Sequence, residues 1–199
     1  MSTPHSIRPF QPKDLAAVAA AWNRFWASTP RGFAAEPDEF AARVLLAPGF
    51  ADTTMLVAAA ADGAVRGFAH FGPREPWWFL QVDRRPPDPS VGMIYTLCAE
   101  DAATFTSLLH TAEAQLAAQG AEEAWLWPSW AQGAIPLYNG LTSSNEVSGL
   151  WSRHVLVDRA RASGYEVHGT YAVGTLSRKA ARPVDTQRAA PWRRDPITA

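Results

Sequence analysis

Residues 91–128 constrain the fold most, because a strongly periodic helix lies there between two runs that favour β-strand. The apolar side chains of this helix recur on one face, at Phe105, Leu108, Leu109, Ala112 and Leu116. Gly120 supplies its natural end. The runs at 92–98 and 124–127 are rich in apolar and β-favouring residues. A helix joining two such strands predicts a parallel crossover.

Composition limits the chain to one well-packed domain and excludes several classes of function. Its 199 residues are 47% hydrophobic, with a net charge of −1, which gives no basic field for nucleic acid or an anionic membrane. No apolar run approaches ~20 residues and the N-terminus lacks a signal pattern, so we predict a cytoplasmic protein without a membrane partner. Cys98 is the single cysteine and the five histidines show no ligand spacing, which predicts no metal site.

The first half of the chain predicts a strand, two helices and a hairpin. The strand covers 6–10, and a helix then starts at residue 13 or 14, with a second helix at 37–46. The first helix has an apolar face made of Leu15, Val18, Trp22, Phe25 and Trp26. Two β-like runs, 54–60 and 64–71, flank Asp62-Gly63, which suits a tight turn. Residues 72–90 predict a long irregular loop.

The second half completes an α/β fold with a mixed sheet. A helix is predicted at 152–163, closed by Gly164, and one or two strands at 165–176. Residues 178–199 carry six arginines and lysines against two aspartates, together with three prolines. We therefore predict one domain at 1–177 and a Pro/Arg-rich disordered tail or linker at 178–199.

The order of these elements resembles the GNAT superfamily of acyl-CoA N-acyltransferases, over nearly the whole of residues 6–177. Residues 107–121 are similar to the long helix that follows the cofactor loop of that family. Pro-Leu-Tyr-Asn-Gly at 136–140 resembles more particularly one half of tandem GNAT proteins. The resemblance implies a mixed sheet of six to seven strands flanked by four helices. It also implies acetyl-CoA as the acyl donor, and a small-molecule amine, a second GNAT domain or a second copy in a homodimer as partner.

The cofactor loop departs from the pattern of the family, which is Gln/Arg-x-x-Gly-x-Gly/Ala. The matching positions here are 100–105, so that Glu100 replaces the basic or amide residue. Phe105 replaces a small residue, and its ring is expected to stand in the loop where a diphosphate would lie. A carboxylate about 5 Å from a phosphate repels it by roughly 3 kcal/mol at an effective dielectric of 20. Asp101 is placed to cap the helix and to take the amides that a phosphate would need. The family often has a tyrosine that protonates the departing thiolate, and the matching position here is Ala160.

The resemblance also implies where a site would lie. Cofactor contacts are expected from the backbone of Thr96, Leu97 and Cys98. The catalytic candidates are Glu146 and Tyr138, with Glu100 and His70 as further bases that could approach the site. An acceptor pocket is expected from Trp77, Trp78 and Asn139. Two hypotheses stay open: an N-acetyltransferase acting on an unidentified amine, and a catalytically silent GNAT-fold module that binds a ligand or docks on a domain.

Overall fold

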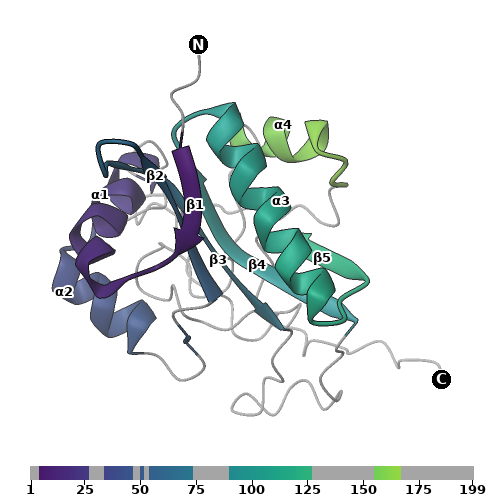
Figure 1. Cartoon of the computed structure of the whole chain (residues 1–199), viewed down its shortest axis with the longest axis horizontal. Coiled ribbons are helices and arrows are strands. Elements are labelled where there is room, and N and C mark those ends of the chain that lie inside the picture. The colour runs from purple at the N-terminus through teal and green to yellow at the C-terminus, as the bar shows by residue number, and fades with distance from the viewer. Residues whose placement is uncertain are drawn as a thin grey trace, which may run out of the picture. The chain divides into compact units, whose positions relative to one another are not determined.

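A mixed sheet of five strands forms the centre of the part of the chain that the computed structural model describes (Figure 1). The described residues are 5–26, 34–46, 50–51, 54–73, 90–126 and 155–166. The strands follow sequence order across the sheet: β1 His5–Pro9, β2 Met55–Ala60, β3 Val65–Pro73, β4 Val91–Ala99 and β5 Glu123–Leu126. Neighbours from β1 to β4 are antiparallel, and β5 is parallel to β4. The predicted crossover is thus confirmed.

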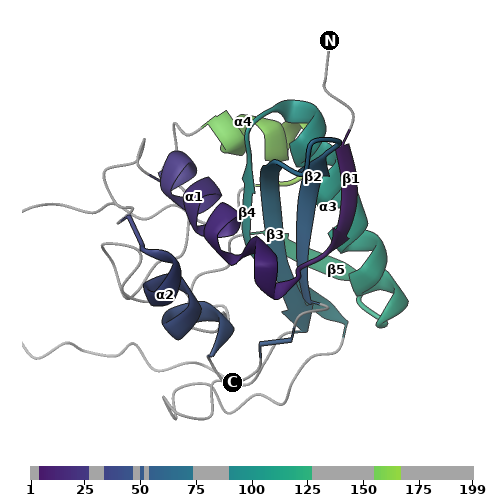
Figure 2. The ribbon, with the colours of Figure 1, turned by 60° about the vertical axis from the view of Figure 1, so that its left-hand side comes forward.

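Helices cover both faces of the sheet (Figure 2). They are α1 Leu15–Trp26, α2 Pro37–Phe40, α3 Ala102–Ala118 and α4 Val155–Ala162. One 3₁₀ turn, Pro12–Asp14, leads into α1, and a wider π turn, Ala41–Leu45, continues α2. The first two helices lie on one face and the last two on the other. No helix within the described ranges is long and apolar enough to cross a membrane.

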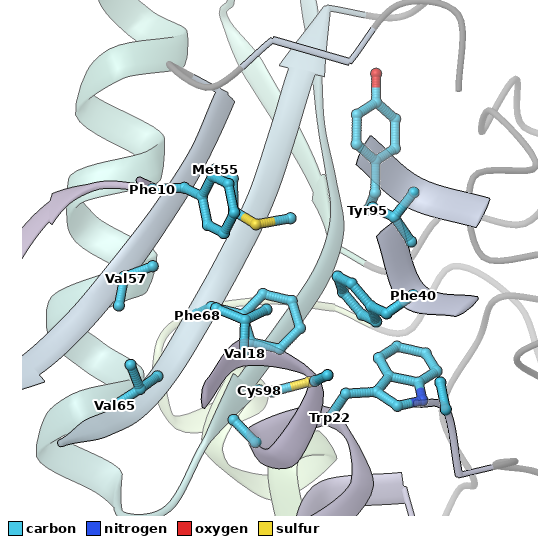
Figure 3. Close-up of a cluster of buried hydrophobic side chains, with 14 of the residues drawn as sticks. Phe10, Val18, Trp22, Phe40, Met55, Val57, Val65, Phe68, Tyr95 and Cys98 are labelled. Carbon is cyan, nitrogen blue, oxygen red and sulfur yellow. The ribbon is translucent and has the colours of Figure 1, made fainter. Parts of the chain in front are cut away.

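Two hydrophobic cores result, one on each face. The core under α1 and α2 includes Val18, Trp22, Phe40, Met55 and Phe68, as Figure 3 shows. The core under α3 and α4 includes Leu56, Phe71, Leu97, Phe105, Leu108 and Ala160. Every residue of β2 and β4 is buried as a consequence. Near-continuous apolar runs are typical of strands that are covered on both faces.

A β-bulge interrupts β4 and changes which side chains face which core. His70 lies opposite Thr96 and Phe71 opposite Ile94, so Tyr95 is the extra residue on β4. Tyr95 lies in the core under α1. Beyond it the alternation is shifted by one residue, and Leu97 packs under α3. Strict alternation along the strand would have placed Leu97 in the other core.

The helix ends agree with the sequence. Gly120 has φ +97, and its amide donates to the carbonyl of Ala117 at 3.0 Å. The amide of Ala121 donates to the carbonyl of Leu116, also at 3.0 Å, which completes a Schellman motif. The left-handed backbone that this motif requires suits glycine, because it has no Cβ. α4 ends in the same way at Gly164.

The hairpin lies where it was predicted, whereas the end of β3 and the number of strands differ from the prediction. The hairpin loop covers residues 61–63, between the two predicted runs: the amide of Ala60 donates to the carbonyl of Ala64 at 2.9 Å, and the amide of Gly63 donates to the carbonyl of Ala60 at 2.8 Å. β3 continues to Pro73, two residues into the predicted loop, since it still pairs with β4 there. The described residues form five strands rather than six or seven. The predicted tail, and all but two residues of the predicted terminal strands, lie outside them.

Candidate active site at the end of β4

The candidate site is the second half of β4 and the beginning of α3. β5 pairs with the first four residues of β4, ending where Ile94 lies opposite Leu126. β4 continues for another five residues, to Ala99. Among the described residues, no strand pairs with this second half on the side of β5. An unpaired strand edge presents backbone amides and carbonyls that a ligand can use.

The backbone direction shows which residues face this open edge. The amide of Glu100 donates to the carbonyl of Arg66 on β3 at 3.0 Å, so Glu100 faces β3. Successive residues of an extended strand point to opposite edges, which directs Leu97 and Ala99 away from β3. Arg159 of α4 reaches the carbonyl of Ala99 at 3.4 Å, as this direction requires. Of the three predicted backbone contacts, Leu97 therefore lies on the open edge, whereas Thr96 and Cys98 face β3.

The side chains of the same three residues are buried. Leu97 is fully buried under α3, and Cys98 lies in the core under α1. The hydroxyl of Thr96 lies 3.9 Å from Cys98 Sγ. Cys98 is a free, buried cysteine, and such a side chain packs as a small hydrophobe.

Asp101 caps α3, as predicted. Its Oδ1 accepts the amide of Thr104 at 2.8 Å, and its Oδ2 accepts the Thr104 hydroxyl at 3.0 Å. The hydrogen bond from the Thr104 amide is the main reason why the pKa of Asp101 is below its usual value. The carboxylate thus occupies a donor at the helix N-terminus that an anion could otherwise use.

Glu100 is paired rather than isolated. Its Oε1 lies 2.9 Å from Arg24 Nη2, and its Oε2 lies 3.1 Å from Arg66 Nη1. Two arginines and one glutamate give this group a net charge of +1. The expected repulsion of a phosphate treated Glu100 as unpaired, so this structure overturns that estimate. Each pair is partly exposed, and such pairs contribute at most about 1 kcal/mol to stability.

Two further departures from the GNAT pattern are located in the core. Phe105 is fully buried under α3 and so does not stand where a diphosphate would lie. The prediction that its ring obstructs the loop is therefore wrong, because the first turn of α3 points this residue toward the sheet. Ala160, in place of a tyrosine, is also buried in that core.

His70 is buried in the other core, on β3. Its ring contacts Phe50 and Tyr95 with centroids 5.4 Å and 5.2 Å apart. Burial lowers the pKa of His70 to about 3, because a charged imidazole would lose its hydration. A group with so low a pKa is a weak base near neutral pH. The structure thus argues against His70 as the general base.

Tyr165 links α4 to α3. Its hydroxyl donates to Glu113 Oε1 at 2.8 Å, and burial together with this bond raises its pKa above the usual value. The phenol therefore stays protonated, and Tyr165 packs against the core under α3. Trp125 packs against the core under α1, and its Nε1 donates to Glu123 Oε2 at 3.1 Å.

The remaining predicted site residues lie outside the described part of the chain: Tyr138, Glu146, Trp77, Trp78 and Asn139. In the described ranges, no group of three or more His, Cys, Asp or Glu side chains could hold a metal ion. The arginines near the end of β4, namely Arg24, Arg66 and Arg159, were not singled out from the sequence. They are distant along the chain, and no short motif connects them.

Solved structures that share this arrangement include proteins described as acetyltransferases. The aminoglycoside N-acetyltransferase AAC(6′)-Iy bound to a CoA-S-monomethyl-acetylneamine bisubstrate analogue superposes with a TM-score of 0.51 and 13% identity, covering 88% of this chain and 99% of that one. A protein from Pyrococcus furiosus that is described as an acetyl transferase superposes with a TM-score of 0.53 and 15% identity. The match covers 87% of this chain and 100% of that one.

AAC(6′)-Iy in complex with CoA gives a TM-score of 0.50 at 14% identity, covering 89% of this chain and 97% of that one. No protein-family model and no curated protein sequence matches the chain. Likeness at this level of identity establishes architecture, and function has to be argued from the site. The chain has the GNAT fold.

Proposed function

We propose that this protein is an acyl-CoA-dependent N-acyltransferase that uses acetyl-CoA and acetylates an amine. The observation that carries the proposal is the Leu97 peptide, which points to the open edge of β4 within a GNAT fold. An amide in this place can donate to the carbonyl oxygen of a thioester laid along the strand. Neighbours with CoA bound support the choice of donor.

The chemistry needs few groups from the protein. Acetyl-CoA supplies an activated thioester, and a neutral amine attacks its carbonyl carbon, which places negative charge on the carbonyl oxygen. The amide of Leu97 would stabilise that charge. A base has to take a proton from the ammonium form of the acceptor, and an acid has to protonate the departing thiolate. We assign these roles to Glu146 and Tyr138 on the sequence argument alone.

A small-molecule amine is the acceptor class that best fits. One neighbour, an aminoglycoside N-acetyltransferase, was solved with the bisubstrate analogue CoA-S-monomethyl-acetylneamine. Trp77, Trp78 and Asn139 are proposed to line the acceptor pocket. Aromatic side chains bind the apolar body of a ligand and can also face a cationic amine.

Calorimetric titration with acetyl-CoA, followed by a thiol-release assay with a panel of amines, tests this function. The expected result is micromolar binding that free CoA competes away, and CoA release that depends on an amine. The variant His110→Gln, on an exposed position of α3, is the matched control and should behave as the wild type. The absence of binding at millimolar acetyl-CoA would refute the proposal.

A catalytically silent module is the second candidate, and the Asp101 cap favours it. The carboxylate already satisfies a donor at the N-terminus of α3, where CoA diphosphates would bind in a GNAT enzyme. Such a module would bind another small ligand, dock on a second GNAT domain or form a homodimer. The titration distinguishes the two candidates, because a silent module should give no heat with acetyl-CoA.

A further inference from the structure

Arg159 differs from the other arginines in the described part of the chain because it has no carboxylate partner there. The others all form ion pairs: Arg8 with Asp14, Arg24 and Arg66 with Glu100, Arg43 with Glu39, and Arg161 with Asp158. Arg159 lies on α4 and is half-buried, and its guanidinium donates to a backbone carbonyl rather than to an acidic side chain. A partly desolvated guanidinium without an anion is unfavourable, so this position suits a negatively charged ligand.

The position of Arg159 relates it to the candidate site. Its Nη1 donates to the carbonyl of Ala99 at 3.4 Å, a long and weak hydrogen bond. That carbonyl lies on the open edge of β4, two residues beyond Leu97. Figures 1 and 2 both show α4 beside the first turns of α3. A guanidinium has five N–H donors, and this contact uses one of them.

We propose that Arg159 is an anion-binding residue for the diphosphate of acyl-CoA, an inference that rests on the proposed function. Asp101 occupies a helix-terminal donor that could hold a phosphate, and Arg24 and Arg66 are paired with Glu100, so a cation without a carboxylate partner has to come from another element. A planar guanidinium matches two phosphate oxygens with parallel hydrogen bonds. α4 thus replaces part of the loop at 100–105 as the anchor of the nucleotide.

A purely structural role for Arg159 makes a different prediction. If it only tethers α4 to β4, a neutral side chain that can still donate to Ala99 should suffice. Arg159→Gln keeps a hydrogen-bond donor and removes the charge. Arg159→Lys keeps the charge but loses the two parallel N–H donors of the guanidinium. Arg161→Gln is the matched control, since Arg161 is exposed on the same helix and pairs with Asp158.

Equilibrium binding of acetyl-CoA and of S-acetylpantetheine, which lacks the nucleotide and its diphosphate, tests the proposal. Arg159→Gln should weaken acetyl-CoA binding roughly 10- to 100-fold and leave S-acetylpantetheine binding within twofold. Arg159→Lys should show a smaller loss, and Arg161→Gln none. Melting temperatures should stay close to that of the wild type.

Two results would overturn the assignment of Arg159. Acetyl-CoA affinity within twofold of wild type in Arg159→Gln would show that the charge is not used. Equal losses for both ligands would show that Arg159 shapes α4 rather than binding a diphosphate. Failure of the wild-type protein to bind acetyl-CoA at all is a separate outcome, which refutes the proposed function and this inference with it.

Discussion

Replacing Asp101 should destabilise the protein and at the same time strengthen anion binding. The carboxylate accepts both the amide and the hydroxyl of Thr104, and Thr104 is 1% exposed. Asp101→Ala removes both acceptors, so the N-terminus of α3 loses its cap and a buried hydroxyl loses its partner. Asp101→Asn is the matched variant, because its Oδ1 can still accept the amide of Thr104 while the charge is gone.

The loss of stability follows from these two bonds. A lost cap costs about 1 kcal/mol. A buried hydroxyl left without a partner costs about 1 kcal/mol more. A total of roughly 2 kcal/mol lowers the melting temperature of a domain of this size by about 4 to 8 °C. Asp101→Asn should lose less than about 1 kcal/mol, because asparagine caps as well as aspartate.

The gain in anion binding has two sources. Removing a negative charge from the helix N-terminus removes a repulsion, and the Ala variant also frees the amide of Thr104. Solvent screens both effects, so we expect inorganic pyrophosphate and acetyl-CoA to bind Asp101→Ala about 10-fold more tightly than wild type. The affinity of Asp101→Asn should lie between those of the wild type and Asp101→Ala.

Thermal unfolding followed by far-UV circular dichroism at pH 7 and calorimetric titration at low salt measure the two effects. A lower melting temperature in Asp101→Ala with unchanged affinity for both anions would show that the carboxylate does not compete with a ligand. An unchanged melting temperature would contradict the capping energy itself.

Three further predictions concern the cores. In the unfolded chain His70 gains a proton below about pH 6.5, whereas in the folded protein it stays neutral to about pH 3. The free energy of unfolding therefore decreases as the pH is lowered, by about 2 kcal/mol from about pH 7 to about pH 5. His70→Phe should flatten this dependence in denaturant titrations, whereas the exposed His110→Gln should not. The pKa of Asp14 is lowered, chiefly by its hydrogen bonds to an arginine of β1, so its stabilisation is lost below about pH 4. Asp14→Asn should cost about 2 kcal/mol at pH 7, with a difference from wild type that shrinks in acid; a constant difference would contradict the ion pair. Gly67→Ala should cost about 1 to 3 kcal/mol in the same titrations, because a Cβ there would clash with the backbone oxygen of Cys98; wild-type stability would show that the strands can separate without cost.

Local patterns predicted the elements of this fold well where the signal is periodic. The stripe on α3 and the glycine after it define that helix, because both depend on residues within one or two turns. The bulge at Tyr95 had no local signal, since it arises from the register between β3 and β4. Pairing across strands likewise extended β3 to Pro73, beyond the boundary that prolines and glycines indicated.

The candidate site was predicted in part. Asp101 as a cap could be foreseen, because an aspartate just before a periodic helix is a local signal. The pairing of Glu100 with Arg24 and Arg66 could not, because these residues come from three different elements. Phe105 was placed in the loop by alignment, although its place in the apolar stripe already indicated burial.

Local patterns in the sequence were enough to identify most of the described helices and strands, the ends of α3 and α4, and the GNAT order of the elements. These properties depend on side-chain periodicity and on the backbone freedom of a few glycines, both of which act over short stretches of chain. The tertiary structure was needed to show that Leu97 faces the open edge, that Glu100 is paired with two arginines, and that Arg159 forms no ion pair within the described part of the chain. Charge compensation and strand-edge exposure depend on distances between segments far apart in the chain, and the fold alone sets those distances.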